Sequence, residues 1–296
     1  MKVLVVGMGS IGQRHAVNFK ALSHDVTVCS QRPQADWRNF PKLGQALSEF
    51  QPDYVVIANE TAKHGSCLDE VLKNSSGVKG ILVEKPLYAF LPQQYPALAT
   101  QKVKVAYNMR FHPLIIELRS RLGSMPILGW NAYVGQHLTG WRPQRDYRHV
   151  YSSKRSEGGG AIRDLSHEID MLLFLTGSPS YVAGMGGKVS ALESDADDVF
   201  SLLLKTPNCK HANIHMNCVD HLTQRKLTVH TETETFELDF IAGTFRDKQQ
   251  TRTLVVDRNE SYVNMARAFI AHDERMCSFE EGWNINALIE QAETKI

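Results

Sequence analysis

Cysteine, long apolar runs and an excess of charge of either sign are all scarce in this sequence. Its 296 residues include five cysteines, an odd number with no Cys-x-x-Cys pair, and a chain of this length can build a core without disulfides. Scattered thiols are typical of a reducing compartment, so we expect a cytoplasmic protein. No apolar run approaches the roughly 18 residues of a membrane span. The apolar start at 3–6 gives way to glycines before it reaches the length of a signal peptide, so neither secretion nor a membrane partner is expected.

The charge balance excludes further partners. There are 33 Lys and Arg against 32 Asp and Glu, a formal net charge of +1, which gives no electrostatic basis for binding nucleic acid. The length and the 43% hydrophobic fraction predict a globular protein of two domains.

The most informative segment is a glycine-rich turn near the start. Apolar residues 3–6 predict a strand and residues 11–22 predict a helix, with Gly7, Gly9 and Gly12 at the Gly-x-Gly-x-x-Gly spacing. This arrangement is typical of a dinucleotide phosphate site: the first glycine permits the turn, the second admits the pyrophosphate and the third lets helix pack on strand. Free N–H groups at the helix start would face the anion. The predicted pyrophosphate contacts are Gly7, Gly9, Ser10, Ile11 and Gly12. An ordinary tight turn is the alternative.

The end of the second predicted strand, at 25–29, indicates which dinucleotide is bound. The residue at this position contacts the adenosine ribose, and an Asp or Glu there would bind both ribose hydroxyls. The sequence has Ser30, Gln31 and Arg32 instead. A hydroxyl and a guanidinium suit a 2′-phosphate, so Ser30 and Arg32 are predicted cofactor contacts and NADP is preferred over NAD. A solvated arginine at a strand end is the alternative.

Three later strand ends supply polar residues to the crevice where ligands bind in doubly wound sheets. The strands predicted at 53–59, 80–83 and 103–107 lead into Asn59, into Glu84-Lys85-Pro86 and into Asn108-x-Arg110. The proline fixes the turn, so Lys85 would project into the crevice, with a solvated lysine as the alternative. His64 follows the first of these ends, where cofactor contact and a capping or packing role are both open.

The second half predicts a different architecture. A strand at 127–136 precedes a segment at 141–148 that is rich in cations and aromatics. Its Arg142, Arg145 and Tyr147 either bind a hydroxylated or phosphorylated ligand or form an ordinary surface loop. Strands at about 181–189, 198–206, 210–218, 225–231 and 234–240 predict a large, mainly antiparallel sheet, with closing helices near 260–272 and 281–294.

Glycines 158–160 precede a helix predicted over 161–176, with Gly177 as its cap. Asp164 and His167 are three residues apart and would share one surface of that helix, where an acid can orient an imidazole and stabilise its protonated form. A favourable Asp and a structural His at a helix start are the alternative.

Two segments invite a metal interpretation. Asp170 extends the Asp164–His167 spacing, but it lies about 120° from Asp164 around a helix axis. On a strand at 210–218, His211 and His215 share one face while Cys218 points to the other, so polar/apolar alternation explains the pattern better than zinc does. No metal is predicted.

Four motifs in order resemble the Gfo/Idh/MocA oxidoreductases, named after glucose-fructose oxidoreductase and inositol dehydrogenase. They are the glycine turn continuing into Arg14-His15, Glu84-Lys85-Pro86, Asn108-x-Arg110-Phe111, and Gly158-Gly159-Gly160 before Asp164 and His167. The resemblance implies a Rossmann domain with a doubly wound parallel sheet at 1–112. An α+β domain for substrate binding and oligomerisation, with a large antiparallel sheet, would follow at 113–296, and its last helix could pack back on the first domain. The family usually has three residues between the Asp and the His, whereas only Leu165 and Ser166 intervene here.

The resemblance also implies a chemistry: NAD(P)-dependent hydride transfer to or from a hydroxyl or carbonyl carbon of a sugar, sugar nucleotide or polyol. The further cofactor contacts are Asn59, His64, Glu84, Lys85 and Arg110, and the substrate contacts are Lys85, Asn108, Arg142, Arg145, Tyr147, Arg163 and His167. His167 is the predicted proton acceptor because imidazole titrates near neutral pH, while Lys85 would hold and polarise the substrate oxygen and Asp164 would complete the catalytic set. Family members often associate through the open face of the sheet, which predicts a homodimer or homotetramer.

Two alternative functions stay open at this point. A catalytically silent NAD(P)-binding sensor or co-regulator would keep the fold without turnover, although retention of Lys85 and His167 argues against it. A reductase of a non-sugar substrate would need a more apolar pocket than Arg142, Arg145 and Arg148 suggest.

Overall fold

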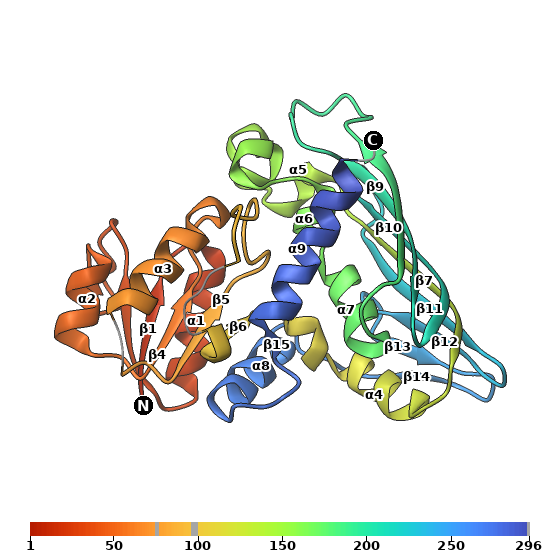
Figure 1. Ribbon diagram of the computed structural model, residues 1–296, viewed down its shortest axis with the longest axis horizontal. Coiled ribbons are helices and arrows are strands. Elements are labelled where there is room, and N and C mark those ends of the chain that lie inside the picture. The colour runs from red at the N-terminus through yellow and green to blue at the C-terminus, as the bar shows by residue number, and fades with distance from the viewer. Residues whose placement is uncertain (75–76, 96–99, 295–296) are drawn as a thin grey trace. The chain divides into compact units, whose positions relative to one another are not determined.

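The computed structural model describes residues 1–74, 77–95 and 100–294 (Figure 1). The chain divides into two compact units. Unit 1 comprises Met1–Asn108 and Asn259–Asn286, and unit 2 comprises Met109–Arg258 and Ala287–Ile296.

Unit 1 contains a seven-stranded sheet in the order β15-β6-β5-β4-β1-β2-β3. Its strands are β1 (Lys2–Val6), β2 (Asp25–Cys29), β3 (Asn39–Phe40), β4 (Tyr54–Ile57), β5 (Gly80–Val83), β6 (Val103–Val105) and β15 (Cys277–Ser278). All pairs are parallel except β15 on β6. The central strands are apolar along their whole length and fully buried, as expected for a parallel sheet covered on both faces. This confirms the predicted doubly wound parallel sheet.

Three helices of unit 1 connect its strands along the sequence, and a fourth comes from the later segment Asn259–Asn286. They are α1 (Ser10–Ala21), α2 (Leu43–Phe50), α3 (His64–Asn74) and α8 (Glu260–Ile270), with 3₁₀ turns at Thr61–Lys63 and Thr100–Lys102. A further 3₁₀ turn at Asn108–Phe111 begins in unit 1 and ends in unit 2. Helix α9 (Phe279–Glu293) begins in unit 1 and ends in unit 2. Helix α8 packs on α1, where the Asn18 and Asn259 amides exchange two hydrogen bonds of 3.1 and 2.6 Å.

Unit 2 contains an eight-stranded sheet in the order β14-β13-β12-β11-β7-β10-β9-β8. Its strands are β7 (Ile127–Gly135), β8 (Tyr181–Gly187), β9 (Val199–Thr206), β10 (Cys209–Asn217), β11 (Gln224–Thr231), β12 (Thr235–Asp239), β13 (Thr244–Arg246) and β14 (Thr251–Thr253). Only β7 and β10 pair in parallel, so the predicted mainly antiparallel sheet is confirmed. Along β10, Ala212, Ile214 and Met216 are buried while His211 and His215 lie on the other face, which is the alternation read from the sequence.

The helices of unit 2 are α4 (Pro113–Leu122), α5 (Leu138–Trp141), α6 (Ala161–Asp164) and α7 (His167–Thr176), with 3₁₀ turns at Tyr147–His149, Tyr151–Ser153 and Arg155–Glu157. Helices α6 and α7 pack on one face of the sheet, and the opposite face is open (Figure 1).

The single helix predicted over 161–176 is wrong. It is interrupted at Leu165–Ser166, where the backbone bonds change from the four-residue to the three-residue spacing: Leu165 N–H donates to Ala161, but Ser166 N–H donates to Arg163 and Glu168 N–H to Leu165. Asp164 therefore ends one helix and His167 begins the next, rather than both lying on one helix surface.

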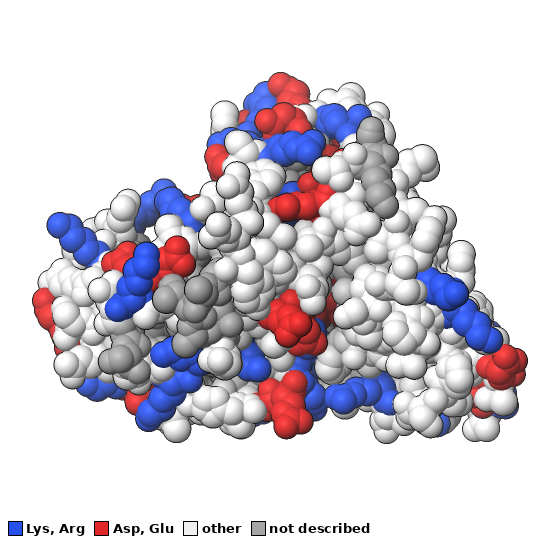
Figure 2. All heavy atoms as spheres, in the orientation of Figure 1, with Lys and Arg blue, Asp and Glu red and all other residues white. Residues whose placement is uncertain are grey.

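Within the described ranges, no helix is long and apolar enough to cross a membrane. On the face drawn in Figure 2, Lys and Arg are interspersed with Asp and Glu. This distribution agrees with the balanced composition of the chain.

Candidate active site

The glycine turn after β1 has no room for side chains at two of its three glycines. Gly7 has a φ of +92°, and a Cβ there would lie 2.6 Å from the Asn59 backbone. A Cβ on Gly12 would collide with the Gly7 carbonyl oxygen. Both sites therefore require glycine so that α1 can start directly behind the strand ends.

Gly9 differs from the other two because a Cβ there would meet nothing within 4 Å. Gly9 is the N-cap of α1, and no side chain caps the helix. The first-turn N–H groups at Ser10, Ile11 and Gly12 have no intrahelical acceptor, and they lie at the positive end of the helix dipole. An open, donor-rich helix start fits the pyrophosphate of a dinucleotide.

The β2 end forms a short loop organised by Ser30. The Ser30 hydroxyl accepts hydrogen bonds from Arg32 N–H at 3.2 Å and from Gln34 at 3.5 Å. The Arg32 side chain is exposed and has no ion pair within 4 Å among the described residues. It lies near Glu60, whose pKa is held below its usual value by its own backbone N–H, by Lys63 and more weakly by Arg32. Glu60 is a carboxylate that the sequence reasoning missed at this edge.

Asn59 and His64 link the ends of β4 and β5. The His64 ring is buried, with Nδ1 2.9 Å from the Pro86 carbonyl oxygen and Nε2 3.3 Å from that of Asn59. Burial lowers the pKa of His64. The Asn59 amide donates to the Cys67 sulfur at 3.1 Å, while its buried Oδ1 has no partner among the described residues. Asn59 thus offers an acceptor beside the glycine turn, and His64 holds a packing position.

Glu84 and Lys85 directly follow β5, and the Lys85–Pro86 peptide bond is cis. The Glu84 carboxylate is buried, with one oxygen 2.7 Å from His15 Nε2 and the other accepting the Lys85 N–H at 3.2 Å. His15 was not among the predicted site residues. The structure therefore places the two motifs of unit 1 in contact.

Asn108 and Arg110 are both buried and both bonded within their own units. The Asn108 amide donates to the Ser261 hydroxyl at 2.7 Å. Arg110 donates Nε and Nη2 to the Asp170 carboxylate at 2.7–3.1 Å, and its guanidinium lies 4.7 Å from the Phe174 ring. Arg110 thus anchors α7, and its predicted cofactor contact stays a prediction.

His167 begins the turn of α7 that carries two buried, ion-paired carboxylates. Glu168 is buried and accepts two hydrogen bonds from Arg225 of β11, at 2.7 and 3.1 Å. Asp170 accepts the hydrogen bonds of the Arg110 guanidinium. Planar two-point ion pairs fix orientation as well as distance, so the helix turn that begins with His167 is held at two residues.

Asp164 ends α6, whose start is built against Asp197. The Asp197 carbonyl accepts from Ala161 N–H at 2.9 Å and its carboxylate from Ile162 N–H at 3.0 Å. Gly160 is required here because its φ is +121° and a Cβ would collide with the Asp197 carboxylate. Burial, followed by the nearby carboxylates, raises the pKa of Asp197 to about 6. The sequence analysis assigned Asp197 no role.

The loop at 141–157 contributes an aromatic ring next to Asp164. Burial and the negative charge of Asp164, to which the hydroxyl is hydrogen-bonded, raise the pKa of Tyr151. The Arg142 guanidinium lies 5.2 Å from the same ring. Tyr151, Arg142 and Asp164 therefore form one cluster, in which Tyr151 was not predicted.

Three further predicted substrate residues of unit 2 differ in exposure and in their partners. Arg145 is exposed, and the Tyr147 hydroxyl accepts from Glu193 N–H at 3.2 Å. Arg163 is fully buried and pairs with Glu293 at 2.6 Å. Within the described residues, no group of three or more His, Cys, Asp or Glu is arranged to hold a metal ion.

The fold and the glycine turn define a Rossmann-type protein with a second unit built on an open antiparallel sheet. Residues 128–237 match the family described as the GFO/IDH/MocA C-terminal domain. Over these residues the predicted resemblance to the Gfo/Idh/MocA proteins is confirmed.

One sequence relative agrees with this result. The chain is 34% identical over 120 residues to the Salmonella typhimurium (strain LT2) protein YceM, which is called an oxidoreductase by name alone. The match spans 38% of this chain and 38% of YceM, a little over a third of each protein.

Several solved structures share the whole fold. UDP-N-acetylglucosamine 3-dehydrogenase GnnA from Acidithiobacillus ferrooxidans has a TM-score of 0.77 at 21% identity, covering 100% of this chain and 97% of that one. Levoglucosan dehydrogenase in complex with NADH has a TM-score of 0.81 at 16% identity, with coverage of 100% and 97%. The WlbA dehydrogenase from Bordetella pertussis, in complex with NADH and UDP-GlcNAcA, has a TM-score of 0.76 at 16% identity, with the same coverage. At these identities the likeness establishes the fold.

Proposed function

We propose that this protein is an NAD(P)-dependent oxidoreductase acting on a hydroxyl or carbonyl carbon of a sugar, sugar nucleotide or polyol. The observation that carries the proposal is the start of α1, where Gly9 leaves open space in front of first-turn N–H donors. The named activities and ligands of the structural neighbours, which are sugar and sugar-nucleotide dehydrogenases and NADH complexes, support the same class.

The chain's own residues would bind the cofactor and manage one proton. Asn59 Oδ1, the open N–H groups of α1 and the Ser30–Arg32 loop are the groups that fit a dinucleotide. The nicotinamide, when bound, supplies the hydride acceptor or donor. His167 takes the substrate hydroxyl proton in the oxidation direction, and Lys85 holds the substrate oxygen as a hydrogen-bond donor. Asp164 carries a negative charge in the unit that contains His167, and it orients Tyr151 through their hydrogen bond.

Side chains of the second unit support the proposed substrate class. Arg142 stacks over Tyr151, and the adjoining loop exposes Arg145. Guanidinium groups beside an aromatic hydroxyl suit hydroxylated or phosphorylated ligands, which supports a sugar or sugar nucleotide over an apolar substrate.

The cofactor preference is tested by binding before any turnover is measured. We expect NADP to raise the melting temperature more than NAD does at equal concentration, because the exposed Arg32 makes no ion pair among the described residues and is available for a 2′-phosphate. Arg32→Ala should remove the difference and leave NAD stabilisation in place. Equal or larger stabilisation by NAD would contradict the preference and make Glu60 the candidate ribose ligand.

Catalysis is tested with His167→Asn on a panel of sugars and nucleotide sugars. Loss of a positioned base is expected to lower turnover by ~10²–10⁴-fold at saturating cofactor, without weakening cofactor binding. Undiminished turnover would overturn the assignment of His167. Tight cofactor binding with no turnover of any panel member by the unsubstituted protein would instead indicate the silent sensor.

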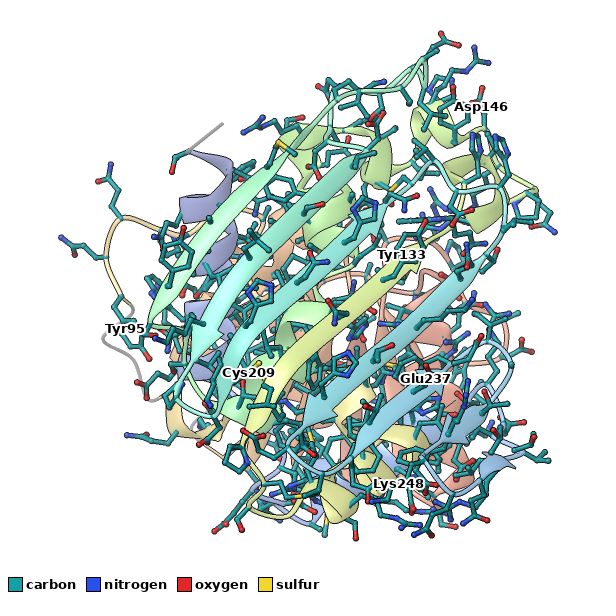
Figure 3. The ribbon with its side chains drawn as sticks, turned by 90° about the vertical axis from the view of Figure 1, so that its right-hand side faces the viewer. Tyr95, Tyr133, Asp146, Cys209, Glu237 and Lys248 are labelled. Atoms are coloured by element: carbon teal, nitrogen blue, oxygen red, sulfur yellow. The ribbon has the colours of Figure 1, made fainter. Side chains whose placement is uncertain are left out.

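The open face of the unit 2 sheet is the proposed site of self-association. Register places Met185, Ser201, His215, Tyr133 and Lys226 in one row across β8, β9, β10, β7 and β11, and Figure 3 shows this face around Tyr133. Apolar side chains at Tyr181, Met185 and Leu203 are 57%, 77% and 45% exposed on the same face, an unusual grouping for a surface that stays in water. Leu203→Glu should shift light-scattering mass toward the monomer if a dimer or tetramer forms there.

A further inference from the structure

A buried hydrogen bond connects the first helix of unit 1 to the residue before Lys85. His15, in the second turn of α1, is fully buried, and its Nε2 lies 2.7 Å from Glu84 Oε1. Its ring has two aromatic neighbours: the ring centroid of Phe19 is 6.4 Å from that of His15, and the ring centroid of Tyr262 is 6.1 Å from it. Among the described residues His15 Nδ1 has no hydrogen-bond partner, so Nε2 is the polar link of this imidazole.

The Glu84 carboxylate divides its two oxygens between α1 and the peptide that follows β5. Oε1 faces His15, and Oε2 accepts the Lys85 backbone N–H at 3.2 Å. Glu84 N–H donates to the Ile57 carbonyl at 2.8 Å, which ties this residue to β4 as well. The point from which the Lys85 side chain leaves the backbone is therefore fixed by Glu84, and Glu84 by His15.

The charge of Glu84 depends on the same contact. Burial pushes the pKa of Glu84 upward, but the hydrogen bond and charge of His15 and the charge of Lys85 outweigh it and hold the pKa below its usual value. Glu84 is thus a carboxylate, and His15 Nε2–H donates. The charged and titratable groups that interact electrostatically with Glu84 are His15 on α1, the adjacent Lys85 and His64 on α3.

We propose that His15 is a positioning residue for Lys85. Through the Glu84 carboxylate it fixes the Lys85 backbone and keeps a negative charge that favours the ammonium form of Lys85. This inference rests on the proposed function, in which Lys85 holds the substrate oxygen while His167 takes the proton. It assigns the histidine after the glycine turn a task in catalysis rather than in the packing of α1 alone.

Two substitutions separate the donor from the ring. His15→Gln keeps an N–H donor at about the position of Nε2 but removes the ring, whereas His15→Phe keeps a ring of similar size and removes the donor. A purely structural role predicts that Phe preserves the protein and Gln disturbs it. Our proposal predicts the reverse. His24→Phe is the matched control, because His24 also contacts Phe19, at 6.0 Å, and makes no bond to Glu84.

The first readout does not depend on activity. Limited acetylation with acetic anhydride at pH 7, followed by peptide mass spectrometry, reports the neutral-amine fraction of Lys85 against the exposed Lys210 in the same chain. His15→Phe should accelerate Lys85 acetylation at least about threefold, because Glu84 loses its charge or its position, while His15→Gln and His24→Phe should leave the rate near that of the unsubstituted protein.

The second readout is turnover at saturating cofactor and substrate. We expect His15→Phe to lower kcat by about tenfold with cofactor affinity retained, and His15→Gln to restore most of the loss. If His15→Phe does not fold, Glu84→Gln replaces it in both assays, since it removes the charge while keeping a carbonyl oxygen for the Lys85 N–H.

Each result decides one question. Unchanged or slower Lys85 acetylation in folded His15→Phe, or equal effects of Phe and Gln, would overturn the role of His15. Accelerated acetylation in a protein that turns over no sugar would support the His15–Glu84–Lys85 link and reject the proposed function instead.

Discussion

The glycine turn of unit 1 and the start of α7 in unit 2 are built in opposite ways. In the turn, Gly7 and Gly12 collide with backbone atoms if they carry a side chain, and most of the parts lie within six consecutive residues. At α7, Glu168 and Asp170 are held by Arg225 and Arg110, which lie 57 and 60 residues away in the chain. A steric requirement can be read from local sequence, whereas a pairing of distant charges cannot.

The largest expected effect comes from breaking the more buried anchor of α7. Arg110→Met leaves the fully buried Asp170 carboxylate without its fork, and we expect a loss of about 3–5 kcal/mol in unfolding free energy. Urea unfolding measures it. Arg225→Met is the matched control and should cost less, because the Arg225 side chain is 21% exposed and water can reach Glu168. Equal losses would show that burial does not set the strength of these anchors.

The next effect compares two glycines of the same turn. Gly12→Ala should cost about 1–3 kcal/mol or more of stability, since the added methyl collides with the Gly7 backbone. Gly9→Ala meets open space and should leave stability unchanged, yet weaken dinucleotide binding by occupying the place of the pyrophosphate. Thermal unfolding and cofactor titration of both variants test this. Intact cofactor binding in Gly9→Ala would contradict the assigned position of the phosphates.

The smallest effect is a pH dependence with opposite signs at two neighbouring residues. The raised pKa of Asp197, about 6, means that the folded state holds its proton more tightly, so this group lowers stability as the pH rises from about 4 to 6. Burial pushes the pKa of Asp198 upward, but hydrogen bonds from Ser190 and Lys188 leave it lowered, so this group adds stability above its unfolded pKa and loses it in acid.

Asp197→Asn should therefore be about 1 kcal/mol more stable than the unsubstituted protein at pH 8, an advantage that disappears by pH 4. Asp198→Asn should be less stable at pH 8, and its deficit should shrink toward acid. Denaturant unfolding at several pH values gives both differences. The same sign for both variants would show that the two carboxylates share one environment.

The predicted strands agreed with the structure where apolar periodicity determined them. Strand β4 is apolar throughout because both faces of its sheet are covered, whereas β10 alternates polar and apolar residues because one face of its sheet is open. Both strands lie where they were expected. The short strands β3 and β15 were not predicted, because two residues carry no periodicity.

The candidate site was predictable only in part. The helix over 161–176 was read as continuous because Leu165 and Ile169 keep helical spacing across the break at Ser166. Asp197 was not among the predicted site residues, because nothing in its local sequence indicates that Gly160 lies against its carboxylate. Tyr151 lies beyond the segment 141–148 from which ligand contacts were predicted, although its hydroxyl is hydrogen-bonded to Asp164.

The division of unit 1 into two stretches of chain has a consequence for synthesis on the ribosome. The ring centroid of Phe269 in α8 lies 6.5 Å from that of Phe19 and 5.3 Å from that of Tyr54. Strand β15 completes the sheet beside β6. These partners are translated only after Met109–Arg258. A nascent chain that has just released β6 therefore carries the aromatic side chains of Phe19 and Tyr54 without their cover, and it must stay soluble in that state, or be held by a chaperone, until nearly the entire protein has been made.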